Sequence, residues 1–102
     1  MNVTELAGKI NGKIISGSEK ELEGCYIGDL LSLAMSKVQE NNIWITIQTN
    51  INSVAVASLT EAGCIVICDG FTLDDNALVK AKEEDISVIC SEMSAYEIAK
   101  LI

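Results

Sequence analysis

The chain has 102 residues, of which 49% are hydrophobic, and it contains no proline, histidine or arginine. This length supplies the core of one domain but not of two, so we expect a single domain over residues 1–102. Seven lysines against fifteen carboxylates give a net charge of −8. Such a surface repels nucleic-acid phosphates and anionic membranes, and we expect neither as a partner.

The beginning of the chain has the composition of a folded domain rather than of a targeting segment. Residues 1–5, Met-Asn-Val-Thr-Glu, form neither a basic nor an apolar run, and a signal peptide needs both. No uninterrupted apolar stretch approaches the length of a membrane span. We expect a soluble, cytoplasmic protein.

Four cysteines are predicted to be free thiols that fill core space. Two of them, Cys64 and Cys68, lie in one expected strand at a separation of about 13 Å, which is too long for a disulfide. No histidine and no Cys-x-x-Cys pair accompanies them, so a metal site is disfavoured. Burial is also the expectation for Cys25 and Cys90.

The first half of the chain is predicted to hold two short strands and two helices. Apolar residues at positions 3, 6, 7 and 10 have helical spacing, and Asn11-Gly12 ends that helix. Asp29 is expected to be the N-cap of the second helix. The expected helices cover residues 2–10 and 30–38, and the expected strands cover 13–16 and 25–27.

The second half alternates apolar runs with helical patterns three times. This rhythm is typical of an α/β fold with a mainly parallel sheet flanked by helices and right-handed crossovers. Asn50 or Asn52 is expected to cap the first helix, Thr72 or Asp74 the second, and Ser94-x-x-Glu97 is a capping box for the third. The strands are expected at 43–47, 64–68 and 86–90, and the helices at about 52–62, 74–84 and 94–101.

Polar residues follow the expected strands, at the edge where open parallel sheets bind ligands. Ser91-Glu92 follows the last strand, and Phe71, the only phenylalanine, is expected in the core. Asn50 and Asn52 have a simpler alternative role, which is to cap and turn the chain. The candidate ligand-binding residues are Gly28, Asp29, Gln48, Asn50, Asn52, Asp69 and Gly70.

The charge of this edge limits the ligand. Asp29 and Asp69 both belong to it, and the chain as a whole carries −8. Like charges oppose a bare polyphosphate, so the expected ligand is neutral, zwitterionic or bridged by a cation.

Catalytic groups are scarce in this sequence. Without histidine there is no imidazole base, and without arginine there is no bidentate clamp for a phosphoryl group. No Walker loop or Gly-x-Gly-x-x-Gly occurs. The acidic residues Asp74-Asp75 and Glu83-Glu84-Asp85 fit helix ends better than a metal site. We expect no catalytic residue, no cofactor and no metal.

Three segments resemble the DRTGG domain family, especially its small stand-alone clostridial-type members. They are Gly28-Asp29-Leu30-Leu31-Ser32, Trp44-Ile45-Thr46-Ile47-Gln48-Thr49-Asn50-Ile51-Asn52 and Val54-Ala55-Val56-Ala57. The family is similar to phosphotransacetylase N-terminal regions, to regulatory inserts of some pyrophosphatases and to the N-terminal, non-kinase part of HPr kinase. Its Gly-Asp-Arg becomes Gly28-Asp29-Leu30 here, and its Thr-Gly-Gly becomes Cys68-Asp69-Gly70.

The resemblance implies a homodimeric, non-enzymatic regulatory or ligand-sensing domain. A small metabolite or an adenine nucleotide is the implied ligand. Some family members are encoded near iron hydrogenase components, which implies a link to that enzyme or to energy metabolism. The alternative is a protein-interaction or assembly factor without a small ligand, and an enzyme ranks third.

Overall fold

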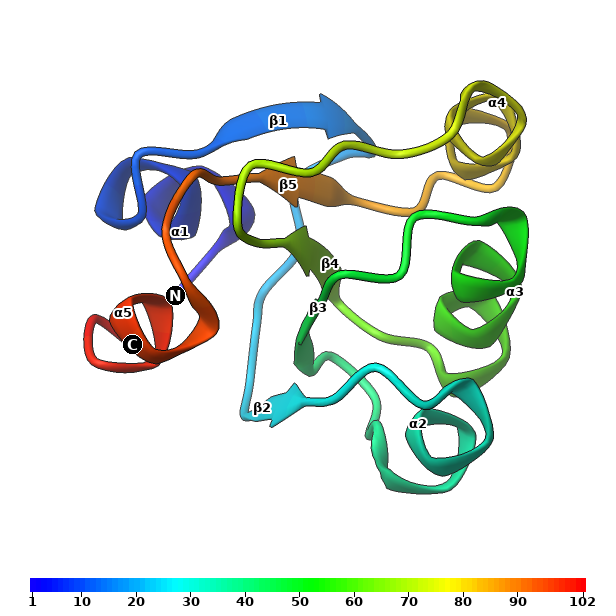
Figure 1. The fold of residues 1–102 in the computed structure, drawn as a ribbon, viewed down its shortest axis with the longest axis horizontal. Coiled ribbons are helices and arrows are strands. Elements are labelled where there is room, and N and C mark those ends of the chain that lie inside the picture. Colours follow the sequence, from blue (N-terminus) through cyan, green and yellow to red (C-terminus); the bar gives the residue numbers. More distant parts are fainter.

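A computed structural model describes the whole chain, Met1–Ile102, as a five-stranded sheet with helices on both faces (Figure 1). The strand order is β1-β5-β4-β3-β2. Strands β2, β3, β4 and β5 run parallel to one another, whereas β1 joins the sheet antiparallel to β5. The prediction of an α/β fold with a mainly parallel sheet is confirmed. The strands are β1 (Lys13–Ser16), β2 (Cys25–Ile27), β3 (Ile43–Thr46), β4 (Cys64–Ile67) and β5 (Val88–Cys90).

Two cores lie on the two faces of the sheet, because alternate side chains of a strand point to opposite sides. One core contains Trp44 and Ile65 and packs against α2, α3 and α4. The other contains Ile45 and Val66 and packs against α1 and α5. Figure 1 shows the two helical layers. The helices are α1 (Val3–Lys9), α2 (Leu31–Lys37), α3 (Ile51–Thr60), α4 (Asp75–Glu83) and α5 (Ala95–Ala99).

The chain changes sides of the sheet at β5. The helices that follow β2, β3 and β4 all pack on the first face. The helix that follows β5 packs on the opposite face, beside α1. The loops after the adjacent strands β4 and β5 therefore diverge to opposite faces. None of the helices has the length and apolar composition needed to cross a membrane.

Predicted residues occupy the N-cap position of three of the four helices for which a cap was predicted. The Asn50 side chain caps α3 by accepting a hydrogen bond from the Asn52 N–H at 2.9 Å, and the Ser94–Glu97 capping box is present on α5. Asp74 stands at the N-cap position of α4, as predicted, but its side chain makes no capping hydrogen bond and accepts one from the Thr49 hydroxyl instead. The Asp29 cap is wrong, since Leu30 stands at the N-cap of α2.

The predicted burial is right for two cysteines. Cys64 and Cys68 are buried, Cys90 is half-buried, and Cys25 is exposed because it lies in the edge strand β2. Phe71 was expected in the core, but 51% of it is exposed. The reason is that it lies in the loop that leaves the sheet after β4.

Alkaline pH is expected to destabilise the fold through Cys64. Burial raises the pKa of this thiol from 9.0 to about 12, so above about pH 9 only the unfolded chain releases its proton. The linked loss of stability is about 2 kcal/mol at pH 10.5. Urea unfolding at about pH 8 and pH 10.5 measures it. Between these two pH values, Cys64→Ala should lose less stability than the wild type. An equal loss in the wild type and in Cys64→Ala contradicts the prediction.

Candidate functional site

The polar residues that follow β2 and β3 hydrogen-bond mainly to one another. The Asp29 carboxylate accepts from the Thr46 hydroxyl and from the Ile47 N–H, both at 2.9 Å. The Gln48 amide donates to the Asp29 carbonyl at 2.7 Å and accepts from the Asn50 amide at 3.0 Å. These bonds join the two loops, and they explain why Asp29 does not cap α2.

Two further residues of the predicted ligand-binding set, Gly28 and Asn52, do not point to one common site. The Gly28 carbonyl accepts a hydrogen bond of 3.0 Å from the indole N–H of the buried Trp44. Asn52 lies on α3 and lines a shallow apolar hollow with Leu31 and Met35 of α2. Gly28 therefore has a visible packing role, whereas Asn52 faces a different part of the surface.

Asp69 and Gly70 form a tight turn at the end of β4. Both have left-handed backbone angles, with φ values of 60° and 80°. The Asp69 N–H donates to the Met93 carbonyl at 2.9 Å, and the Gly70 N–H donates to the Ser91 carbonyl at 3.0 Å. A Cβ atom on Gly70 would lie 2.8 Å from a carboxylate oxygen of Glu92. The turn thus requires glycine and is fastened to the loop after β5.

A hollow of about 250 Å³ opens between these two loops and the beginning of β1. We call it the β4–β5 crevice. It occupies the place where the loops of adjacent strands diverge, the usual ligand position in open α/β sheets. Its lining residues are Asn11, Lys13, Gly70, Phe71, Cys90, Ser91 and Glu92.

Gly70 is the member of the predicted set that lines the crevice. Ser91 and Glu92 also line the crevice. Their position directly after the last predicted strand is the sequence feature that indicates them as site residues. Lys13 and Asn11 were missed as site residues. They reach the crevice because β1 pairs with β5, with Lys13 opposite Cys90, and nothing in the local sequence specifies that pairing.

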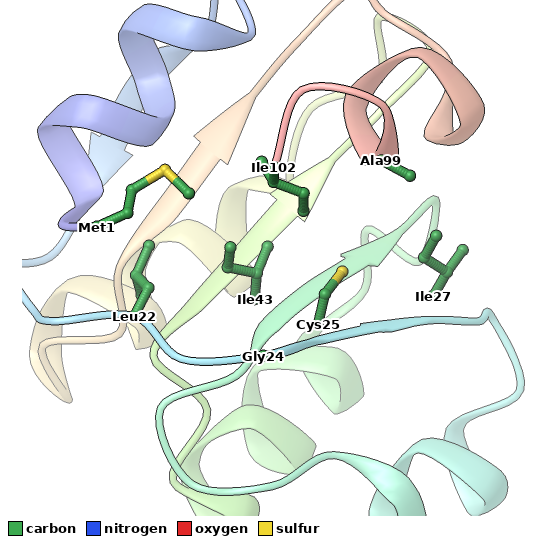
Figure 2. Close-up of a pocket in the computed structure, with 8 residues that line it drawn as sticks. All are labelled: Met1, Leu22, Gly24, Cys25, Ile27, Ile43, Ala99 and Ile102. Carbon is green, nitrogen blue, oxygen red and sulfur yellow. The ribbon is translucent and has the colours of Figure 1, made fainter.

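A second hollow, of about 390 Å³, lies beside the edge strand β2, between the two chain termini (Figure 2). We call it the apolar groove. It has no charged side chain in its lining, and Ile27 is 48% exposed there. Its lining residues are Met1, Leu22, Gly24, Cys25, Ile27, Ile43, Ala99 and Ile102. No cluster of three or more histidine, cysteine, aspartate or glutamate side chains has a metal-binding arrangement.

The fold is similar to a solved structure of the CBS and DRTGG domains in the regulatory region of a Clostridium perfringens pyrophosphatase. That protein was solved with its activator, diadenosine tetraphosphate. The TM-score is 0.77 at 12% sequence identity, and the match covers 97% of this chain but 44% of the other. The present chain thus spans less than half the length of that structure, and a likeness at this identity shows the fold alone.

The sequence comparisons identify the family. No curated protein matches the chain. The family model described as the DRTGG domain matches residues 5–102, which is nearly the whole chain. The protein belongs to the DRTGG domain family.

Proposed function

We propose that this protein is a cytoplasmic, non-enzymatic regulatory domain that senses a small effector at the β4–β5 crevice. The observation that carries the proposal is the position of the crevice where the loops after β4 and β5 diverge to opposite faces of the sheet. The similar fold in a pyrophosphatase regulatory region with a nucleotide activator supports a regulatory role. A small metabolite and an adenine nucleotide are both candidate effectors.

The groups in the crevice support binding rather than catalysis. The chain has no histidine or arginine, and the side-chain hydrogen bonds of Cys90 and Ser91 go to the Thr72 hydroxyl and the Ile10 carbonyl rather than to a base. The Cys90 thiol has the Thr72 hydroxyl as its hydrogen-bond partner, at 3.7 Å, and a hydroxyl is not a base that activates a thiol. We infer that the Asp29–Gln48–Asn50 network holds the neighbouring loops in place, since its hydrogen bonds are mostly internal.

An effector that binds the native crevice is expected to raise the melting temperature. At a concentration 100 times the dissociation constant the gain is about 2.7 kcal/mol, which corresponds to about 10 °C or more in a domain of this size. A thermal-shift screen of nucleotides and phosphometabolites measures the gain. Phe71→Ala, which truncates an exposed side chain of the crevice, should reduce it.

Two glycine variants provide the matched control for that screen. Gly70→Ala should reduce the gain, because the left-handed backbone at Gly70 disfavours a side chain and the new methyl group would displace the Glu92 carboxylate. Gly8→Ala should retain it, because nothing lies within 4 Å of a Cβ at that position. A compound that stabilises the wild type, Phe71→Ala and Gly70→Ala equally binds elsewhere and contradicts the proposal.

We further propose that the protein is a homodimer that buries the apolar groove. The groove adjoins the outer edge of β2, which has no neighbouring strand, and such edges readily pair with another chain unless they are protected. No charged or proline residue within β2 protects it, since the strand reads Cys25-Tyr26-Ile27. The two Ile27 side chains of a symmetric pair would be covered together.

Replacement of Ile27 by lysine is expected to produce a monomer. Light scattering at micromolar concentration should give about twice 10.9 kDa for the wild type and about 10.9 kDa for Ile27→Lys. Leu59→Lys, on the exposed side of α3, should remain dimeric because Leu59 is 72% exposed and outside the groove. A monomeric wild type contradicts the dimer.

A protein-interaction or assembly role without a small ligand is the second candidate, and the apolar groove is the observation that favours it. Under that alternative the groove receives a different protein, and the wild-type chain is a monomer whose crevice binds nothing in the screen. A functional association with iron hydrogenase stays a prediction from the family resemblance.

A further inference from the structure

The β4–β5 crevice contains one cationic and one anionic side chain that do not pair with each other. Lys13 begins β1 and Glu92 follows β5, and both are exposed in the lining of the crevice. The ion pairs of the structure lie elsewhere and join Met1 to Glu21, Lys20 to Asp85 and Lys80 to Glu84. Both charges of the crevice are therefore available to a ligand.

An aromatic surface is available in the same hollow. Phe71 is the only phenylalanine of the chain, and 51% of it is exposed where the β4 loop lines the crevice. An exposed aromatic ring offers a large apolar contact to a ligand. Asn11, next to the start of β1, adds an amide that can donate and accept. The crevice thus combines a cation, an anion and an apolar face.

The size of the crevice limits what it can hold. Its volume of about 250 Å³ is below the range of about 300–1,000 Å³ that is typical for drug-sized ligands. A dinucleotide is larger than this space and would lie mostly outside it, whereas the space matches a molecule of amino-acid size. The Glu92 carboxylate and the overall charge of −8 also oppose a ligand with several phosphates.

We propose that the crevice binds a small zwitterion of amino-acid size with an apolar or aromatic body. The anionic group of the ligand meets the Lys13 ammonium, its ammonium group meets the Glu92 carboxylate, and its body lies against Phe71. Both polar contacts are charge-assisted, which makes them stronger than neutral hydrogen bonds. This inference rests on the proposed function and specifies the chemical class of the effector.

The test uses L-phenylalanine, L-leucine and L-methionine as probes, titrated into the full chain by amide NMR up to about 10 mM, well beyond a millimolar dissociation constant. The expected shifts lie at Gly70, Phe71, Cys90 and Ser91. N-acetyl-L-phenylalanine, which has no ammonium group, and L-phenylalaninamide, which has no carboxylate, should each bind at least about tenfold more weakly than L-phenylalanine.

Variants that remove one charge of the crevice show which side chain binds the ammonium group of the probe and which binds its carboxylate. Glu92→Gln should weaken L-phenylalanine at least about tenfold and leave the N-acetyl form unchanged, because that form lacks the partner of Glu92. Lys13→Met should weaken L-phenylalanine equally and leave the amide form unchanged. Exposed residues outside the crevice supply the controls: Lys37→Met on α2 and Glu83→Gln on α4 should have no effect.

Three outcomes contradict the proposal that the crevice binds a small zwitterion. They are no binding of any of the amino acids up to about 10 mM, equal binding of charged and charge-blocked forms, and equal binding to the wild type and Glu92→Gln. If a nucleotide from the thermal-shift screen shifts the crevice amides and the amino acids do not, the proposed function stands and this inference fails. Amide shifts that cluster away from the crevice for every compound contradict both.

Discussion

Replacement of Ile65 by aspartate is expected to unfold the protein. Ile65 lies in β4, between Trp44 of β3 and Val88 of β5, and none of it is exposed. A carboxylate without a partner at such a site costs several kcal/mol. The whole stability of a small domain is about 5–15 kcal/mol. Circular dichroism should show a loss of structure, and the cooperative thermal transition should disappear.

Two other substitutions test whether the loss of stability comes from burying a carboxylate rather than from any change at Ile65 or any added charge. Ile65→Val removes one methyl group and should cost about 0.5–1.5 kcal/mol. Leu59→Asp introduces the same carboxylate at a position on α3 that is 72% exposed, so it should change stability by less than about 0.5 kcal/mol. An Ile65→Asp protein that melts at the wild-type temperature is incompatible with a central, doubly covered β4.

The parallel half of the fold was predictable because its signals are local. The predicted strands end at residues 47 and 68, because the next residue in each case is polar. The observed strands β3 and β4 end one residue earlier. A strand covered on both faces needs a continuous apolar run, and all four residues of β4 are buried. Caps such as Asn50 were readable for the same reason, since a cap depends on residues within one helical turn.

The order of the strands was not predictable, and it decides which residues are exposed. Cys25 is exposed because β2 is an edge strand, and an isolated Cys-Tyr-Ile run does not show that. Lys13 reaches the crevice because β1 crosses to the far edge and pairs with β5. Such pairings join residues far apart in sequence, so no local pattern specifies them.

The sequence predicts a candidate site at the carboxyl ends of the strands. How the predicted residues divide between that site and mutual hydrogen bonds is visible only in the geometry. Polar side chains at strand ends can bind a ligand or one another. In the loops after β2 and β3, the short distances from Asp29 to Thr46 and from Gln48 to Asn50 favour mutual hydrogen bonds. Gly70 lines a hollow because the neighbouring loops turn to opposite faces there.

Replacement of Trp44 by alanine is expected to lower the melting temperature by more than about 10 °C. Trp44 is fully buried and is the largest side chain of the core. Its removal leaves a cavity, which for tryptophan or phenylalanine to alanine costs about 3–5 kcal/mol. The indole also donates to the Gly28 carbonyl at 3.0 Å, and loss of that bond adds about 1 kcal/mol. Each kcal/mol corresponds to about 4–8 °C in a domain of this size.

Trp44→Phe separates the two contributions to this loss. The phenyl ring fills most of the space but cannot donate to Gly28, so the expected cost is about 1–3 kcal/mol. Because that hydrogen bond fastens the end of β2 to the core, the amides of Ile27 and Gly28 should gain exchange rate before those of β4. Tyr96→Ala, at an aromatic residue that is 71% exposed on α5, is the control and should melt near the wild type. Hydrogen exchange that rises uniformly over the whole sheet in Trp44→Phe contradicts a specific link between this indole and the β2 edge.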